Sequence, residues 1–134
     1  EEEIMPMLQQ EREKGRRSTK ARGDAAEDEA LAWLQAKGLR LLARNYRMPG
    51  RGAAELDLVM QASDGTVVFV EVRQRSSARH GGAGASIGAA KRARIVRAAQ
   101  HYLMRWRQLP PVRFDAVLIE AAGPVWLQAA FDAT

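Results

Sequence analysis

Two apolar runs with acids inside them are the clearest feature of the hydrophobic pattern. The runs cover residues 54–60 (Ala-Glu-Leu-Asp-Leu-Val-Met) and 67–73 (Val-Val-Phe-Val-Glu-Val-Arg). Residues 63–65 between them, Ser-Asp-Gly, have the composition of a tight turn. The pattern therefore predicts a hairpin of two adjacent antiparallel strands.

Alternation along these strands predicts where the polar side chains point. On the first strand, Asp57 should face away from both Leu56 and Leu58. On the second, Glu71 and Arg73 should share one face. If the two faces match, two carboxylates and a guanidinium converge, an arrangement that suits Mg²⁺ binding and phosphate ester chemistry. The alternative is a ladder of charges on the exposed face of a sheet.

The remaining pattern predicts two helices and three further strands. These are helices over 23–37 and 86–107, and strands over 39–47, 113–120 and 125–131, with a turn at Gly123-Pro124. The order helix, three strands, helix, two strands contains no repeat. It predicts one α/β domain over residues 23–134, with a mixed sheet of about five strands and residues 39–47 at an edge. Residues 1–22 are polar, without a sustained apolar period, and are predicted to form a flexible tail.

Two further acids have a local explanation as well as a functional one. Glu27 lies three residues before Ala30 and seven before Leu34, so it projects along the packed face of the first predicted helix. It is a candidate third acid for the metal site, but Asp24-x-x-Glu27 also has the spacing of a capping box. Asp115 is predicted to be an ordinary acid at the start of its strand.

Charge is distributed unevenly along the chain. The net charge is +5, and no acidic residue lies between Glu71 and Asp115. That stretch is rich in arginine, as expected of a surface that attracts a phosphate backbone. A basic surface that serves only solubility is the alternative. The candidate phosphate-binding residues are Arg75, Lys91, Arg94, Arg97 and Arg105.

Composition excludes several classes of protein. The chain has 134 residues, 46% of them hydrophobic, which is enough for one domain with a real core. It has no cysteine, so disulfides, thiolate catalysis and cysteine-ligated zinc are excluded. It also has no long uncharged apolar stretch, so no membrane partner is expected and the cytoplasm is the expected compartment.

A series of short motifs spans residues 23–120. They are Gly23-x-x-x-Glu27-x-x-Ala30, Leu42-Ala43-Arg44-Asn45-Tyr46-Arg47, Glu55-Leu56-Asp57-Leu58, Val68-Phe69-Val70-Glu71-Val72-Arg73-Gln74-Arg75, Lys91 and Arg113-Phe114-Asp115. In this order they resemble the YraN-like family, small bacterial proteins of unestablished role. The resemblance implies a restriction-endonuclease-like fold with a PD-(D/E)xK core, similar to archaeal Holliday-junction resolvases.

The resemblance also implies roles for particular residues. Asp57 and Glu71 would bind Mg²⁺ or Mn²⁺, and Glu27 would be a helix-borne acid near the metal. Arg73 stands where the family usually has lysine. Because arginine keeps its proton in proteins, Arg73 would clamp the phosphate and stabilise charge there. Lys91 begins the basic helix.

The function implied is that of a metal-dependent endonuclease acting on DNA, with branched or single-stranded DNA as the suggested substrates. A nucleic-acid-binding module that keeps the nuclease fold but no longer cuts is the alternative, and Arg73 favours it. A third possibility is an adaptor whose basic face meets an acidic protein. A homodimer is expected only by analogy with the resolvases.

Overall fold

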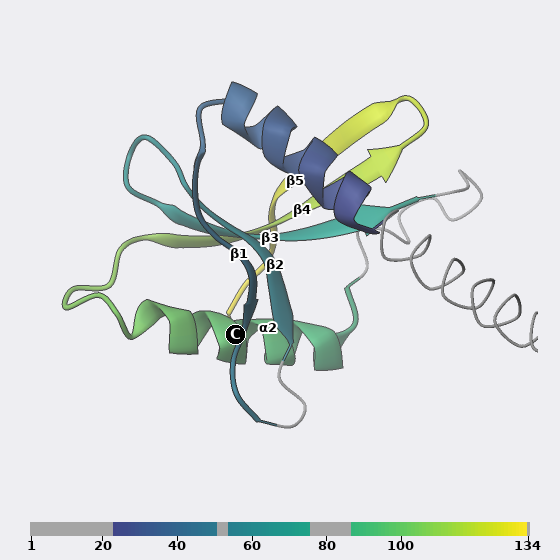
Figure 1. Cartoon of the computed structure of the whole chain (residues 1–134). Helices are drawn as coiled ribbons and strands as arrows, with labels where there is room; N and C mark the ends of the chain where they lie inside the picture. Colours follow the sequence, from purple (N-terminus) through teal and green to yellow (C-terminus); the bar gives the residue numbers. More distant parts are fainter. Residues whose placement is uncertain (1–22, 51–53, 76–86, 134) are drawn as a thin grey trace, which may run out of the picture.

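The computed structural model describes residues 23–50, 54–75 and 87–133 (Figure 1). The predicted tail at residues 1–22 lies outside them. Five strands form one sheet in the order β1-β2-β3-β4-β5. Their bounds are β1 Arg40–Arg47, β2 Glu55–Gln61, β3 Val67–Gln74, β4 Val112–Glu120 and β5 Gly123–Phe131. With one helix over residues 23–36 and another, α2, at Ala89–Leu103, the sheet confirms the predicted α/β fold.

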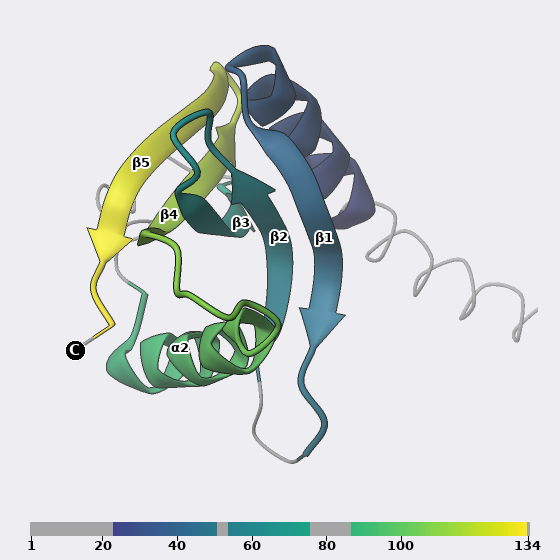
Figure 2. The same cartoon turned by 90° about the vertical axis from the view of Figure 1, so that its left-hand side faces the viewer.

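The two helices pack against different clusters of sheet residues (Figures 1 and 2). The helix over residues 23–36 buries Ala30 and Leu34 against a cluster that includes Leu58. Helix α2 buries Ile95 against a second cluster that includes Phe69. Neither helix in the described part of the chain is long and apolar enough to cross a membrane.

The sheet is mixed because one connection crosses over. Strands β1, β2 and β3 follow one another as antiparallel neighbours, and β4 pairs with β5 in the same way. Strands β3 and β4 are parallel, with Glu71 opposite Ala116. Helix α2 lies in the connection between these parallel strands, as expected for a crossover. β1 lies at one edge of the sheet, as predicted.

The predicted hairpin is confirmed in its turn and in its register. The Thr66 N–H donates to Asp64 Oδ1 at 3.0 Å, and Gly65 has a φ of 91°, a conformation that glycine adopts without steric penalty. The β2–β3 ladder runs from Gln61↔Val67 to Leu58↔Val70. It stops just before the two acids.

Two predicted boundaries are wrong. Helix α2 begins after Gly88 and ends at Leu103, whereas the prediction ran on to Arg107. Beyond the helix, the Trp106 N–H donates to the Leu103 carbonyl at 3.1 Å and closes a turn. The second turn falls on residues 121–122 and not on Gly123-Pro124, because Glu120 already pairs with Gly123. Pro124 fits inside β5 because that strand forms an edge of the sheet.

Candidate active site

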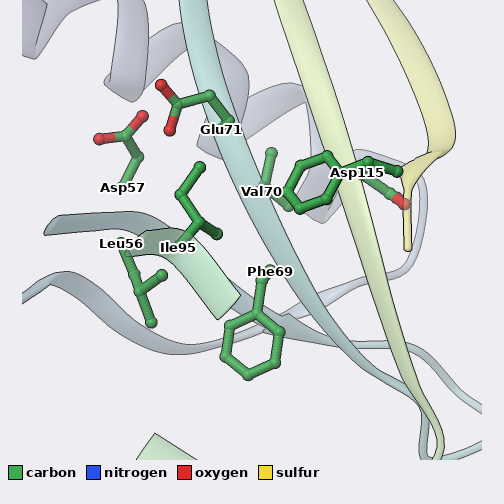
Figure 3. A pocket seen from close by; sticks show the side chains of 8 residues that line it. Leu56, Asp57, Phe69, Val70, Glu71, Ile95 and Asp115 are labelled. Carbon is green, nitrogen blue, oxygen red and sulfur yellow. The ribbon is translucent and has the colours of Figure 1, made fainter. Parts of the chain in front are cut away.

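The two strand acids meet where β2 and β3 separate. Beyond Leu58, the carboxylate of Asp57 accepts the Val72 N–H at 2.8 Å, taking the place of a main-chain acceptor. Glu71 lies on β3, and its side chain is 8% exposed. Figure 3 shows the two carboxylates next to each other at a small cavity that Ile95 also lines. The predicted convergence of Asp57 and Glu71 is present in the structure.

The route to this convergence differs from the simple alternation predicted for β2. Leu56 and Val59 belong to the cluster that packs on α2, whereas Leu58 belongs to the opposite cluster. The prediction that Leu56 and Leu58 share a face is therefore wrong. At the same level of the neighbouring strand β1, Asn45 has a φ of 53°. Both strands are irregular at this level, and Asp57 points into the gap between β2 and β3.

Burial gives Asp57 unusual electrostatics. Loss of solvent, followed by the nearby charge of Glu71, raises the pKa of Asp57 to about 7. The hydrogen bond from Val72 lowers the pKa, but it does not offset these two effects. The negative charge of Glu27 raises the pKa further. Asp57 therefore gains or loses its proton near neutral pH, which is unusual for a carboxyl group and common at functional sites.

Glu27 approaches the pair from the helix over residues 23–36. Its Oε1 lies 3.3 Å from Arg44 Nε. With its amide nitrogen facing the carboxylates, Asn45 donates to Glu27 Oε1 and to Glu55 Oε1, each at 2.9 Å. Burial raises the pKa of Glu27, and Arg44 lowers it. Glu27 is thus bound to β1 and acts on Asp57 through its charge.

The described residues do not already form a direct three-ligand site. Within residues 23–50, 54–75 and 87–133, no three Asp, Glu or His side chains are grouped so that they could hold a metal ion. Asp57, Glu71 and Asp115 all line the cavity, and Figure 3 shows the carboxylates of Asp57 and Glu71 next to each other. The role of Glu27 as a third ligand stays a prediction.

Two cations face the Glu71 carboxylate from different elements. Lys91 Nζ, from α2, lies 2.5 Å from Glu71 Oε1. Arg73 Nε, from β3, lies 4.0 Å from the same oxygen. The predicted placement of Arg73 beside the acids agrees with this geometry. Lys91, predicted to begin the basic helix and to bind phosphate, is the closer of the two cations.

The other predicted phosphate-binding residues have different surroundings. Arg75 Nη1 lies 3.9 Å from Glu120 Oε2. Arg105 donates from Nε to the Tyr102 carbonyl at 2.8 Å, and its guanidinium lies 3.8 Å from the centre of the Tyr102 ring. These two side chains therefore already contribute to the fold.

Arg94 and Arg97 are exposed on α2. Neither forms an ion pair with any residue that the structure describes. Arg105 is exposed as well, but its guanidinium already contacts Tyr102, so Arg94 and Arg97 are better placed for contacts with a phosphate backbone.

Asp115 is the acid whose role sequence reasoning missed. Strand β4 begins three residues earlier, at Val112, and Asp115 is fully buried. Its carboxylate accepts hydrogen bonds from Arg113 at 2.9 and 3.0 Å, from Trp126 Nε1 at 2.8 Å and from the Ala129 N–H at 2.9 Å. The interpretation as an ordinary strand-start acid is wrong. The available signal was Arg113-x-Asp115, because residues two apart share a face of a strand.

Comparison with known proteins places the chain in a family. Residues 26–119 match the model of "Uncharacterised protein family UPF0102". The chain belongs to UPF0102, the YraN family. This membership confirms the resemblance found in the motifs.

UPF0102 proteins of other organisms align with this chain over most of their length. A UPF0102 protein of Paracidovorax citrulli is 68% identical over 116 residues, covering 87% of this chain and 86% of that protein. One from Albidiferax ferrireducens is 62% identical over 116 residues, covering 87% and 91%. One from Methylibium petroleiphilum is 55% identical over 121 residues, covering 87% and 98%. The family is uncharacterised, so its membership assigns no activity.

Proposed function

We propose that this UPF0102 protein is a metal-dependent endonuclease that binds DNA and hydrolyses phosphodiester bonds. The observation that carries the proposal is the pair formed by the partly buried Asp57 and the buried Glu71. The pKa of Asp57 is raised to about 7, first by loss of solvent and then by repulsion from the neighbouring Glu71 carboxylate. A bound divalent cation would relieve this repulsion.

The donor atoms suit Mg²⁺ or Mn²⁺. Both side chains offer oxygen, the ligand that these hard cations prefer, and Mg²⁺ is often held by one or two carboxylates with water and substrate phosphate in its other positions. The ammonium of Lys91 lies against Glu71, and a positive charge already present at that carboxylate supports the fit. Asp57 and Glu71 would hold the ion, which would supply a Lewis acid and activate water.

The surrounding cations suit a phosphate substrate. The guanidinium of Arg73 offers a planar fork of donors, so it would orient the scissile phosphate beside the acid pair. Arg94 and Arg97 would contact neighbouring phosphates of the backbone. Glu27 would favour the cation through its charge.

Cleavage of labelled DNA tests the proposal. Single-stranded, duplex and four-way-junction DNA would be incubated with Mg²⁺, Mn²⁺ or EDTA. We expect metal-dependent cutting, reduced about 100-fold or more in Asp57→Ala, with DNA affinity changed by less than about threefold. Asp132→Ala, which removes an exposed acid, is the control and should cut normally. Cutting by Asp57→Ala at the wild-type rate would contradict the proposal.

One observation favours a second function, a nucleic-acid-binding module without catalysis. Arg73 occupies the place where the family usually has lysine, and arginine cannot give up its proton to help form hydroxide. Binding without cutting by the wild-type protein would support this function. Metal-dependent cutting that first appears in Arg73→Lys would identify a decayed nuclease site.

A further inference from the structure

We propose that Lys91, reaching the acid pair from helix α2, is the lysine that contacts the scissile phosphate. This inference rests on the proposed function and adds a catalytic residue to it. Strand β3 has arginine at the motif position, and α2 supplies the missing ammonium from a different part of the chain. The contact that carries the inference is the 2.5 Å distance between Lys91 Nζ and Glu71 Oε1.

The choice of lysine at this position is unusual within the chain. Lys91 is the only lysine after Lys37, in a stretch of sequence that carries thirteen arginines. A general need for positive charge is therefore met by arginine nearly everywhere in this stretch. Lysine differs from arginine in having a compact ammonium group on a flexible stem, which concentrates charge on one phosphate oxygen. That difference favours a local role at the site.

The position of Lys91 in the helix also needs an explanation. It is the third residue of α2, and the first turn contains no acidic residue and has no side-chain cap. A cation in the first turn lies at the positive end of the helix dipole and is unfavourable there. Glu71, from the sheet, compensates for this. Lys91 is thus held in place by Glu71 and not by the local preferences of its helix.

Lys91 and Arg73 approach the same carboxylate, but they differ in the exposure of their side chains and in their distance from Glu71. The Lys91 side chain is 39% exposed and that of Arg73 is 29% exposed, whereas Glu71 is 8% exposed. The ammonium thus lies between the buried carboxylate and solvent, from which a phosphate would approach. Lys91 would contact a single phosphate oxygen, and Arg73, farther from Glu71, would clamp the phosphate from the side of β3.

Single-turnover cleavage with matched lysine variants tests this assignment. With Mg²⁺, we expect Lys91→Met to slow cleavage about 100-fold while DNA affinity in Ca²⁺ changes less than about threefold. Lys37→Met, which alters an exposed lysine lying over Trp33, is the control and should cleave normally. In the double variant Lys91→Met/Arg73→Lys, a lysine on β3 faces the same Glu71 oxygen. Cleavage should recover at least about tenfold there.

Two results would overturn the assignment. One is cleavage by Lys91→Met within about threefold of the wild-type rate. The other is an equal loss of cleavage and of DNA affinity in Lys91→Met without recovery in the double variant. That second result would reduce Lys91 to an ion pair that fixes α2 against β3.

A readout that does not depend on cleavage separates this inference from the proposed function. The chain has four lysines, so lysine side chains labelled with ¹³C give few NMR signals, and Lys91→Met identifies that of Lys91. Adding a 12-nucleotide single strand with Ca²⁺ should shift the Lys91 signal and leave that of Lys37 unchanged. A Lys91 signal that does not move while DNA binds overturns the inference. If the wild-type protein cuts no DNA but the signal moves, hydrolysis is wrong and the phosphate contact stands.

Discussion

Two acids of the sheet, Asp115 and Asp57, line the same cavity but have different surroundings. Asp115, in β4, and Asp57, in β2, each lie beside a residue with positive φ, Ala129 and Asn45. Asp115 is fully buried, and four hydrogen bonds reach its two oxygens. One donor group is the guanidinium of Arg113, which also neutralises its charge. Neighbouring groups thus supply both the hydrogen bonds and the opposite charge that a buried carboxylate needs.

Asp57 receives far less compensation. Among the residues that the structure describes, a single N–H, that of Val72, donates to Asp57, and its other close neighbour is the carboxylate of Glu71. Burial of an acid therefore does not by itself indicate function in this protein. The difference lies in the number of donors and in the sign of the neighbouring charge, and that difference marks the Asp57 region as a site for a cation.

The largest expected effect on stability comes from removing the carboxylate of Asp115. Asp115→Ala would leave the guanidinium of Arg113 and the N–H groups of Trp126 and Ala129 without their acceptor. Breaking a buried ion pair in this way should lower the free energy of unfolding by about 3–5 kcal/mol. Urea denaturation at pH 7 measures it. Asp132→Ala, at an exposed position, should change stability by less than about 0.5 kcal/mol. A loss below about 1 kcal/mol in Asp115→Ala would show that the network contributes little.

Removing the charge of Asp57 should have the opposite effect and raise stability. The pKa of Asp57 is about 7 in the folded protein and 3.8 as the ordinary value, so ionising the carboxyl group above pH 7 destabilises the fold. Asp57→Asn should raise the free energy of unfolding at pH 8 by about 2 kcal/mol without added metal. Urea denaturation at pH 8 gives the value. If Asp57→Asn is less stable than the wild type, the carboxylate is better compensated than the geometry indicates.

The pH dependence of stability sharpens the same contrast. A folded pKa above the unfolded pKa gives stabilisation that is complete below about pH 4 and lost as the pH rises toward 7. The difference in unfolding free energy between wild type and Asp57→Asn should therefore change across this window and level off above it. Parallel denaturation curves from pH 3.5 to 8.5 measure this difference. A difference that is flat with pH would contradict the raised pKa.

The smallest effects concern the two residues with positive φ. Ala129→Gly relieves the strain of a left-handed conformation and keeps the N–H that Asp115 accepts, so stability should rise by about 0.5 kcal/mol. Asn45→Gly tolerates the same conformation but removes the amide between Glu27 and Glu55. Stability should fall by about 1 kcal/mol. Thermal unfolding of both variants measures the two changes, and a rise in stability in both would show that backbone strain dominates at both positions.

The parts of the site that depend on neighbours in the sequence could be predicted. The turn around Gly65 and the hairpin follow from alternation and turn chemistry within twenty residues, and the hairpin brings Asp57 near Glu71 even though alternation fails at Leu56. The family motifs added Glu27 as a nearby acid, and its charge does act on Asp57.

The parts that depend on distant partners could not be predicted. The facing of Leu56 changes where Asn45, on another strand, departs from regular geometry. The role of Asp115 depends on Trp126 and Ala129, eleven and fourteen residues away. The contact of Lys91 with Glu71 requires α2, which lies in the crossover between β3 and β4, to fold back against the sheet. Charge and periodicity do not contain this information.

The sheet has its strands in chain order, and this gives the site an order of assembly during synthesis. Glu27, Asp57 and Glu71 all precede the crossover, whereas Lys91 follows Glu71 by twenty residues and β4 and β5 come last. A nascent chain that has completed the β1–β3 meander therefore carries all three acids before their closest cation has been added. The charges at the site are balanced only after α2 has been synthesised and folded back, so a chain interrupted at the crossover has the acids without Lys91.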